Sequence, residues 1–166
     1  MKAKHILTQT LALAAGLIAT LSLQAEEGHN HGKKEAGPNG GRLITVVEPH
    51  AEFLLTPDRK VQITFVGEDE KVIAPAEQVV TVTTGDRSAP LKLTFSKVGT
   101  ALVSEQSVPE GNDLPVVVQI KPTPDAKAVI EKFTLNLSNC PGCNRAEYAC
   151  TCEHEAEEKG HEGHNH

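Results

Sequence analysis

The residues best suited to chemistry are the four cysteines of the chain, which all lie in a short stretch toward its C-terminal end. Two residues separate Cys140 from Cys143, and Cys150 and Cys152 follow after a short gap. Thiols this close in sequence can meet around one ion, and four thiolates make a tetrahedral site that suits zinc or a softer metal. His154, two residues further on, offers a substitute ligand.

Two other interpretations of these cysteines stay open. An exported chain meets oxidising conditions, where an even number of cysteines usually forms disulfides, and oxidised cysteines cannot bind metal as thiolates. Pairing of the Cys140/Cys143 unit with the Cys150/Cys152 unit would make a compact end to the chain. A dithiol redox enzyme is disfavoured, because the Cys-Pro-Gly-Cys run follows a predicted strand and lies in a polar tail.

A second potential site is the pentapeptide Glu-Gly-His-Asn-His, which occurs once near the N-terminus and once at the end of the chain. Short histidine-rich tracts are a composition typical of metal binding, because neutral imidazole binds zinc, copper(II), nickel and cobalt. Neighbouring glutamates add a negative potential that attracts cations. The candidate ligands in the two tails are His29, His31, His154, His161, His164 and His166.

A third candidate ligand is His50, which one residue separates from Glu52. If this segment is a strand, the two side chains point from the same face, and an exposed imidazole and carboxylate can bind one ion. The alternative is an ordinary polar strand face close to a turn at Glu48 and Pro49. The sequence leaves both interpretations open.

Composition limits the functions available to this chain. The formal net charge is −6 and aromatic residues make up 3% of the chain, which argues against nucleic-acid binding and favours cations as partners. Met1 is the only methionine, which excludes a methionine-rich copper site from the mature chain. Because no hydrolase or nucleotide-binding motif is present, we expect a binding protein and not an enzyme.

The N-terminal segment has the pattern of a secretory signal peptide. A basic start at Lys2 and Lys4 is followed by an apolar run over 11–23, and we expect cleavage after the small residue Ala25. The apolar run is shorter than the roughly 20 residues that span a membrane, so we expect no membrane insertion after cleavage. The mature protein is therefore predicted to be periplasmic or secreted.

Residues 42–138 alternate apolar and polar side chains with a period of two, which predicts strands with one buried face. The alternation is clearest at 61–65, 91–96, 116–120 and 133–137, and further strands are expected around 43–47, 51–55, 79–83 and 102–104. About seven to nine strands in about a hundred residues predict an all-β fold, a single antiparallel β-sandwich of immunoglobulin-like type.

The predicted domain plan has four parts. A signal peptide (1–25) precedes a flexible arm rich in histidine and glycine (26–41), and the β-sandwich domain covers 42–138. A tail rich in cysteine, histidine and glutamate follows (139–166), and both tails are expected to be disordered in the absence of metal.

Four features of the chain together resemble small periplasmic heavy-metal-binding proteins. They are the export signal, the pair His29 and His31, the glycine-rich run 37–41 and the His50-Ala51-Glu52 run. They are also similar to the histidine-rich N-terminal regions of metal-efflux adaptor proteins. The resemblance implies metal handling, with His29, His31 and His50 as matching positions and a metal-efflux or uptake system as partner. The chain differs from the adaptors, because it has no room for their long helical hairpin and lipoyl-like modules.

We therefore expect an exported transition-metal-binding protein that acts as a periplasmic metal buffer, chaperone or efflux accessory. The alternative is a structural or interaction protein with a disulfide-stapled C-terminal end and no role in metal handling.

Overall fold

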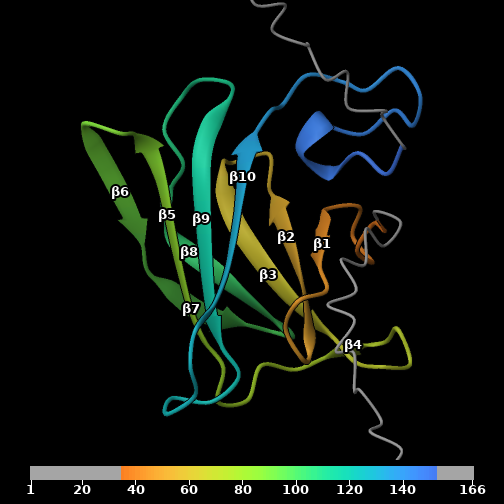
Figure 1. Ribbon diagram of the computed structural model, residues 1–166, viewed down its shortest axis with the longest axis vertical. Helices are drawn as coiled ribbons and strands as arrows, with labels where there is room; N and C mark the ends of the chain where they lie inside the picture. Colours follow the sequence, from red (N-terminus) through yellow and green to blue (C-terminus); the bar gives the residue numbers. More distant parts are fainter. Residues whose placement is uncertain (1–34, 153–166) are drawn as a thin grey trace, which may run out of the picture. The chain divides into compact units, whose positions relative to one another are not determined.

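The computed structural model describes residues 35–152, which form two antiparallel sheets (Figure 1). The larger sheet has the order β1-β2-β3-β8-β7, with β4 paired to β3 beside this path, and the smaller sheet has the order β10-β9-β5-β6. The strands are β1 (Arg42–Ile44), β2 (His50–Leu55), β3 (Lys60–Val66), β4 (Val72–Ile73), β5 (Val79–Asp86), β6 (Ala89–Leu93), β7 (Phe95–Val98), β8 (Ala101–Ser107), β9 (Leu114–Lys121) and β10 (Val129–Leu135).

This architecture confirms the all-β class. Within residues 35–152 the only helical element is one 3-10 turn, η1 (Glu147–Ala149), and no helix there has the length and apolar character to cross a membrane. The predicted signal peptide, the start of the N-terminal arm and the chain after Cys152 lie outside the described residues. The predictions made for those segments therefore remain predictions.

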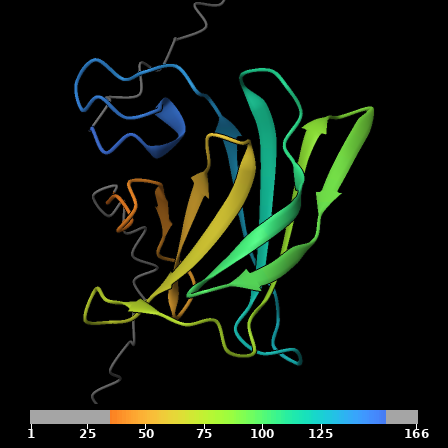
Figure 2. The same ribbon diagram turned by 180° about the vertical axis from the view of Figure 1, so that it is seen from behind.

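One hydrophobic core contains side chains from both sheets. Its members come from alternate positions of the strands, as a period of two requires: Ile63 and Phe65 of β3 are fully buried, and so are Val82 of β5 and its cross-strand partner Val118 of β9. The four-stranded sheet is on the near side in Figure 1, and the six-stranded sheet comes forward in Figure 2. Burial of one face of these strands explains why the apolar alternation predicted them correctly.

The alternation at 91–96 predicted one strand, and the structure divides it between the two sheets. β6 ends at Leu93 in the smaller sheet, and β7 begins at Phe95 in the larger one. The backbone of Thr94 already pairs with β8 of the larger sheet, since its N–H donates to the side chain of Gln106 and its carbonyl accepts from the N–H of Glu105. The chain therefore crosses from one sheet to the other at Thr94.

The segment after β10 returns to the body of the domain. Residues 139–152 are the first part of the predicted tail 139–166, yet Tyr148 and Ala149 belong to the hydrophobic core, with exposed fractions of 7% and 4%. In Figure 1 this segment loops out at the end of β10 and comes back toward β1 and β2. The expectation of a disordered tail is therefore wrong for residues 139–152, because they carry apolar groups that the core buries.

Candidate metal centre

A hairpin-like return after β10 carries all four cysteines. Asn139 and Ala146 form an antiparallel bridge, and the N–H of Glu147 donates to the carbonyl of Ser138 over 2.9 Å. Between these paired residues the chain makes a tight turn, and after them it enters η1. One pair of cysteines therefore lies in this turn and the other follows η1, and the return of the chain brings the two pairs together.

Tyr148 anchors this return to the sheets. Its ring stacks on Phe133 of β10 with centroids 6.4 Å apart and meets Phe53 of β2 edge-on with centroids 5.9 Å apart. The N–H of Leu55 donates to its hydroxyl oxygen over 3.1 Å. Burial raises the pKa of Tyr148, because the phenolate would lose its hydration, so the phenol stays neutral. The cysteines are thus held by a rigid aromatic contact with the core.

The turn at 140–145 has a conformation that its sequence suits. The N–H of Cys140 donates to the carbonyl of Arg145 over 2.7 Å, and the N–H of Asn144 donates to the carbonyl of Cys140 over 2.9 Å. Asn144 has a φ of 57°, a left-handed conformation that asparagine tolerates better than most residues. A Cβ at Gly142 would lie 2.8 Å from the Cys152 sulfur, so only glycine lets the segment after η1 approach this closely.

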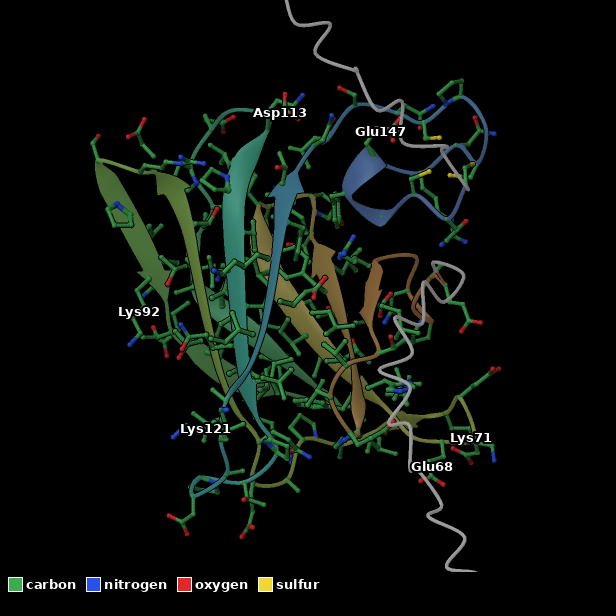
Figure 3. The ribbon with its side chains drawn as sticks, viewed as in Figure 1. Glu68, Lys71, Lys92, Asp113, Lys121 and Glu147 are labelled. Atoms are coloured by element: carbon green, nitrogen blue, oxygen red, sulfur yellow. The ribbon has the colours of Figure 1, made fainter. Side chains whose placement is uncertain are left out.

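The four sulfur atoms gather in one place, beside the labelled Glu147 in Figure 3. The Sγ of Cys150 lies 3.3 Å from that of Cys140 and 3.6 Å from that of Cys143, and the Sγ atoms of Cys140 and Cys152 are 3.9 Å apart. All four lie within 4.8 Å of one another, and no disulfide joins them. A zinc–sulfur bond of about 2.3 Å places two thiolates of a tetrahedron about 3.8 Å apart. The observed spacing is close to that value.

The surroundings of the thiols differ sharply. The backbone N–H groups of Thr151 and Arg145 lower the pKa of Cys143 to about 6, because they donate hydrogen bonds that favour the thiolate. Burial raises the pKa of Cys150 to about 12, because the thiolate would lose its hydration. The pKa of Cys152 is also raised: a hydrogen bond with Cys150 lowers it, but burial and the other two thiols outweigh that contact. A bound cation would supply the charge that lets all of these thiols ionise.

The structure tests the placement of only some predicted ligands. It brings Cys140, Cys143, Cys150 and Cys152 together, as their spacing predicted. Among residues 35–152 this is the one group of three or more histidine, cysteine or acidic side chains close enough to share an ion, and His50 is not part of it. His29, His31, His154, His161, His164 and His166 lie outside the described residues.

Of the two interpretations of His50 and Glu52, the structure does not support one ion shared by the two side chains. Glu52 is fully buried, and its Oε1 accepts the N–H groups of Asn39 and Gly41, each over 2.8 Å. Its Oε2 accepts the side-chain amide of Asn39 over 2.6 Å. The imidazole of His50 instead contacts Glu48, with Nε2 2.8 Å from Oε1. The carboxylate of Glu52 is therefore occupied with holding a loop, and the role of His50 as a ligand stays a prediction.

The same contacts explain the glycine-rich run before β1. A Cβ at Gly37 would lie 2.3 Å from the Cγ of Glu52, and a Cβ at Gly41 would lie 2.3 Å from the carbonyl oxygen of Phe53. The N–H of Gly37 donates to the carbonyl of Gly41, which closes a turn that leads into β1. The run 37–41 and Glu52 thus form one structural clasp, in which a buried carboxylate satisfies the N–H groups of the turn.

We expect Glu52→Gln to weaken this clasp without affecting metal binding. The change keeps the shape of the side chain but removes the charge behind its hydrogen bonds, which should lower the free energy of unfolding by about 1–2 kcal/mol. Urea denaturation measures this loss, with the exposed Glu68→Gln as the matched control expected to be neutral. A fall in zinc stoichiometry in Glu52→Gln with unchanged stability would instead make Glu52 a ligand.

Two residues that matter for the site were missed from the sequence. Tyr148 is the single tyrosine of the chain and stands beside Ala149 in a polar segment, which was the signal that this stretch has something to bury. In the sequence Gly142 is only a spacer between two cysteines, because its role depends on the approach of Cys152. No local pattern indicates this contact between the turn at 140–145 and the segment after η1.

Comparisons of the chain with protein-family models, with curated proteins and with solved structures give no match.

Proposed function

We propose that this protein binds one transition-metal ion through Cys140, Cys143, Cys150 and Cys152. The observation that carries the proposal is the spacing of the four sulfur atoms, all within 4.8 Å of one another, with near neighbours 3.3–3.9 Å apart. This spacing suits one ion at the centre of a tetrahedron. Zinc is the first candidate, because four thiolates in a tetrahedral arrangement select zinc or a softer metal over ions that prefer oxygen ligands.

The surroundings of the site favour holding an ion over catalysis. Four protein ligands complete a tetrahedral shell, whereas catalytic zinc sites keep one position open for water or substrate. Cys140 is fully buried and Cys150 is 6% exposed, so two of the four ligands are closed to solvent. We therefore place the protein among binding proteins and not among enzymes.

The wider proposal is an exported metal buffer, chaperone or efflux accessory that is periplasmic or secreted. In it the histidine-rich tails and His50 add weaker, less selective sites around the cysteine centre. The resemblance to small periplasmic heavy-metal-binding proteins and the predicted signal peptide support this location. We also propose that the two sheets form a sandwich of immunoglobulin-like type, which their shared core supports.

A direct test is zinc titration of the reduced protein, purified without a histidine-affinity step, in competition with a chromogenic chelator. We expect one tight zinc per chain that survives replacement of the six tail histidines by alanine. The variant with all four cysteines changed to serine should lose the tight zinc and keep only weak binding. A tight zinc that persists in this serine variant would contradict the proposal, and elemental analysis of the isolated protein would identify the ion it carries.

The second candidate is a structural protein whose C-terminal end is stapled by disulfides. It is favoured by the burial of Tyr148 and Ala149, because a covalent link would secure a segment that the core already uses. The two candidates differ in one measurable respect. A structural protein isolated from its native compartment would contain disulfides and no metal.

A further inference from the structure

The four thiols of the metal centre are not equally accessible. Cys140 is fully buried and Cys150 is 6% exposed, whereas Cys143 and Cys152 are only partly buried. A reagent from solution must therefore make its first contact with Cys143 or Cys152. Each of these accessible thiols has a buried neighbour: Cys143 lies 3.6 Å from Cys150, and Cys152 lies 3.9 Å from Cys140, measured between sulfur atoms.

From this arrangement we infer that small-molecule disulfides oxidise the cysteines of the metal centre and so release its ion. The disulfides formed in the protein are Cys143–Cys150 and Cys140–Cys152. The inference rests on the proposed function in one respect, since it assumes that an ion is there to be released. The pairing does not follow from distance alone, because the closest sulfurs are those of Cys140 and Cys150, at 3.3 Å. Both of these are buried, so neither can be the first to meet the oxidant.

The chemistry is ordinary thiol–disulfide exchange with oxidised glutathione or a similar disulfide, RSSR. The thiolate of Cys143 attacks one sulfur of RSSR, the S–S bond breaks, and RS⁻ leaves. The thiolate of Cys150 then attacks the sulfur of Cys143 and displaces the second RS⁻. Two cysteines have lost two electrons, RSSR has gained two, and both RS⁻ groups take protons from water. A second RSSR oxidises Cys152 and Cys140 in the same way.

Loss of the first pair is enough to free the ion. A Cys143–Cys150 disulfide removes two of the four thiolates, because oxidised sulfurs no longer bind metal as thiolates. Cys140 and Cys152 remain, and two thiolates hold zinc far less tightly than four. The Cys143–Cys150 disulfide would close a short loop that contains η1, and the Cys140–Cys152 disulfide would close a longer loop around the first. The two links are therefore nested, whereas pairing of Cys140 with Cys150 would leave Cys143 to reach Cys152.

The experiment treats the reduced, zinc-loaded protein with oxidised glutathione, follows released zinc with a chromogenic dye, and maps the disulfides by mass spectrometry. Trypsin cleaves after Arg145 and places the two cysteine units on separate peptides, so fragmentation of the linked peptides distinguishes nested from crossed pairing. We expect one zinc released for each Cys143–Cys150 link formed. Crossed pairing as the main product, or zinc retained after that link has formed, would overturn the inference.

Two double variants test accessibility against distance in the metal-free protein. C140S/C152S keeps an accessible thiol with its buried neighbour, and we expect it to form its disulfide at a rate close to the first step of the wild type. C143S/C152S keeps the closest pair, both buried, and should react about tenfold more slowly. Equal rates in the two variants, with melting temperatures that show both are folded, would contradict the inference. A wild-type protein that binds no zinc would refute the proposed function, while these rates would still test the pairing.

Discussion

Replacing Cys140 by serine is expected to weaken zinc binding about hundredfold. Structural zinc sites in small domains contribute about 10–16 kcal/mol, so one of four ligands carries about 3 kcal/mol, which is about a hundredfold in affinity. The loss should be at least as large here because Cys140 is fully buried, and a serine hydroxyl in its place is a poor ligand that still has to be desolvated. Competition with a chromogenic chelator measures the change.

The matched control is Thr151→Ser, in the same loop. The contribution of Thr151 to the site comes from its backbone N–H, which favours the thiolate of Cys143 and survives the substitution. Its zinc affinity should equal that of the wild type. Gly142→Ala should fall between the two, because the added Cβ would lie 2.8 Å from the Cys152 sulfur and must displace it. Wild-type affinity in Cys140→Ser would mean that the cysteines do not form the tight site.

Replacing Tyr148 by alanine is expected to lower the free energy of unfolding by about 3–5 kcal/mol, as for other large aromatic residues removed from a core. The residue contacts both Phe53 and Phe133, so its loss leaves a cavity between the return segment and the sheets. Urea denaturation of the reduced, metal-free protein measures the loss. Because the same residue positions the cysteines, zinc affinity should fall as well.

The conservative variant keeps this prediction testable if Tyr148→Ala fails to fold. Tyr148→Phe retains the aromatic contacts and removes only the hydroxyl that accepts the N–H of Leu55, so it should cost about 1 kcal/mol. When the free zinc concentration is a thousand times the dissociation constant, zinc should stabilise the wild type by about 4 kcal/mol, because it binds the folded state. A loss of less than about 1 kcal/mol in Tyr148→Ala would show that the return segment is not anchored by this residue.

The elements of the fold could be predicted wherever a strand buries one face. The alternation of Val61, Ile63 and Phe65 predicted β3, because side chains on a strand point alternately to its two faces and these three are buried. The same pattern failed at Thr94, since a period of two says which side chains face inward and not which sheet the backbone joins. β4 was not predicted, because Val72 and Ile73 are too few to set a period and are both exposed.

Some features of the candidate site follow from residues near in the sequence, and others depend on segments that are distant in the sequence. The short spacing of the four cysteines determined that they could meet, because the loops between them are too short to hold them far apart. Only the tertiary structure decided which thiols are buried, because that depends on Tyr148 and Ala149 packing into the core beside strands distant in the sequence. The tertiary structure also decided that Glu52 is buried. A polar residue in a strand was expected to face solvent, but the loop at 37–41 covers Glu52 and donates hydrogen bonds to its carboxylate.

By itself, then, the sequence determined the all-β class and the closeness of the four thiols, because both follow from contacts between residues near in the chain. Tertiary structure alone decided the crossing at Thr94, the clasp around Glu52 and the unequal exposure of Cys143 and Cys150. Each of these depends on segments that meet only after the chain has folded, and burial by a distant segment leaves no local periodicity in the residues that it covers.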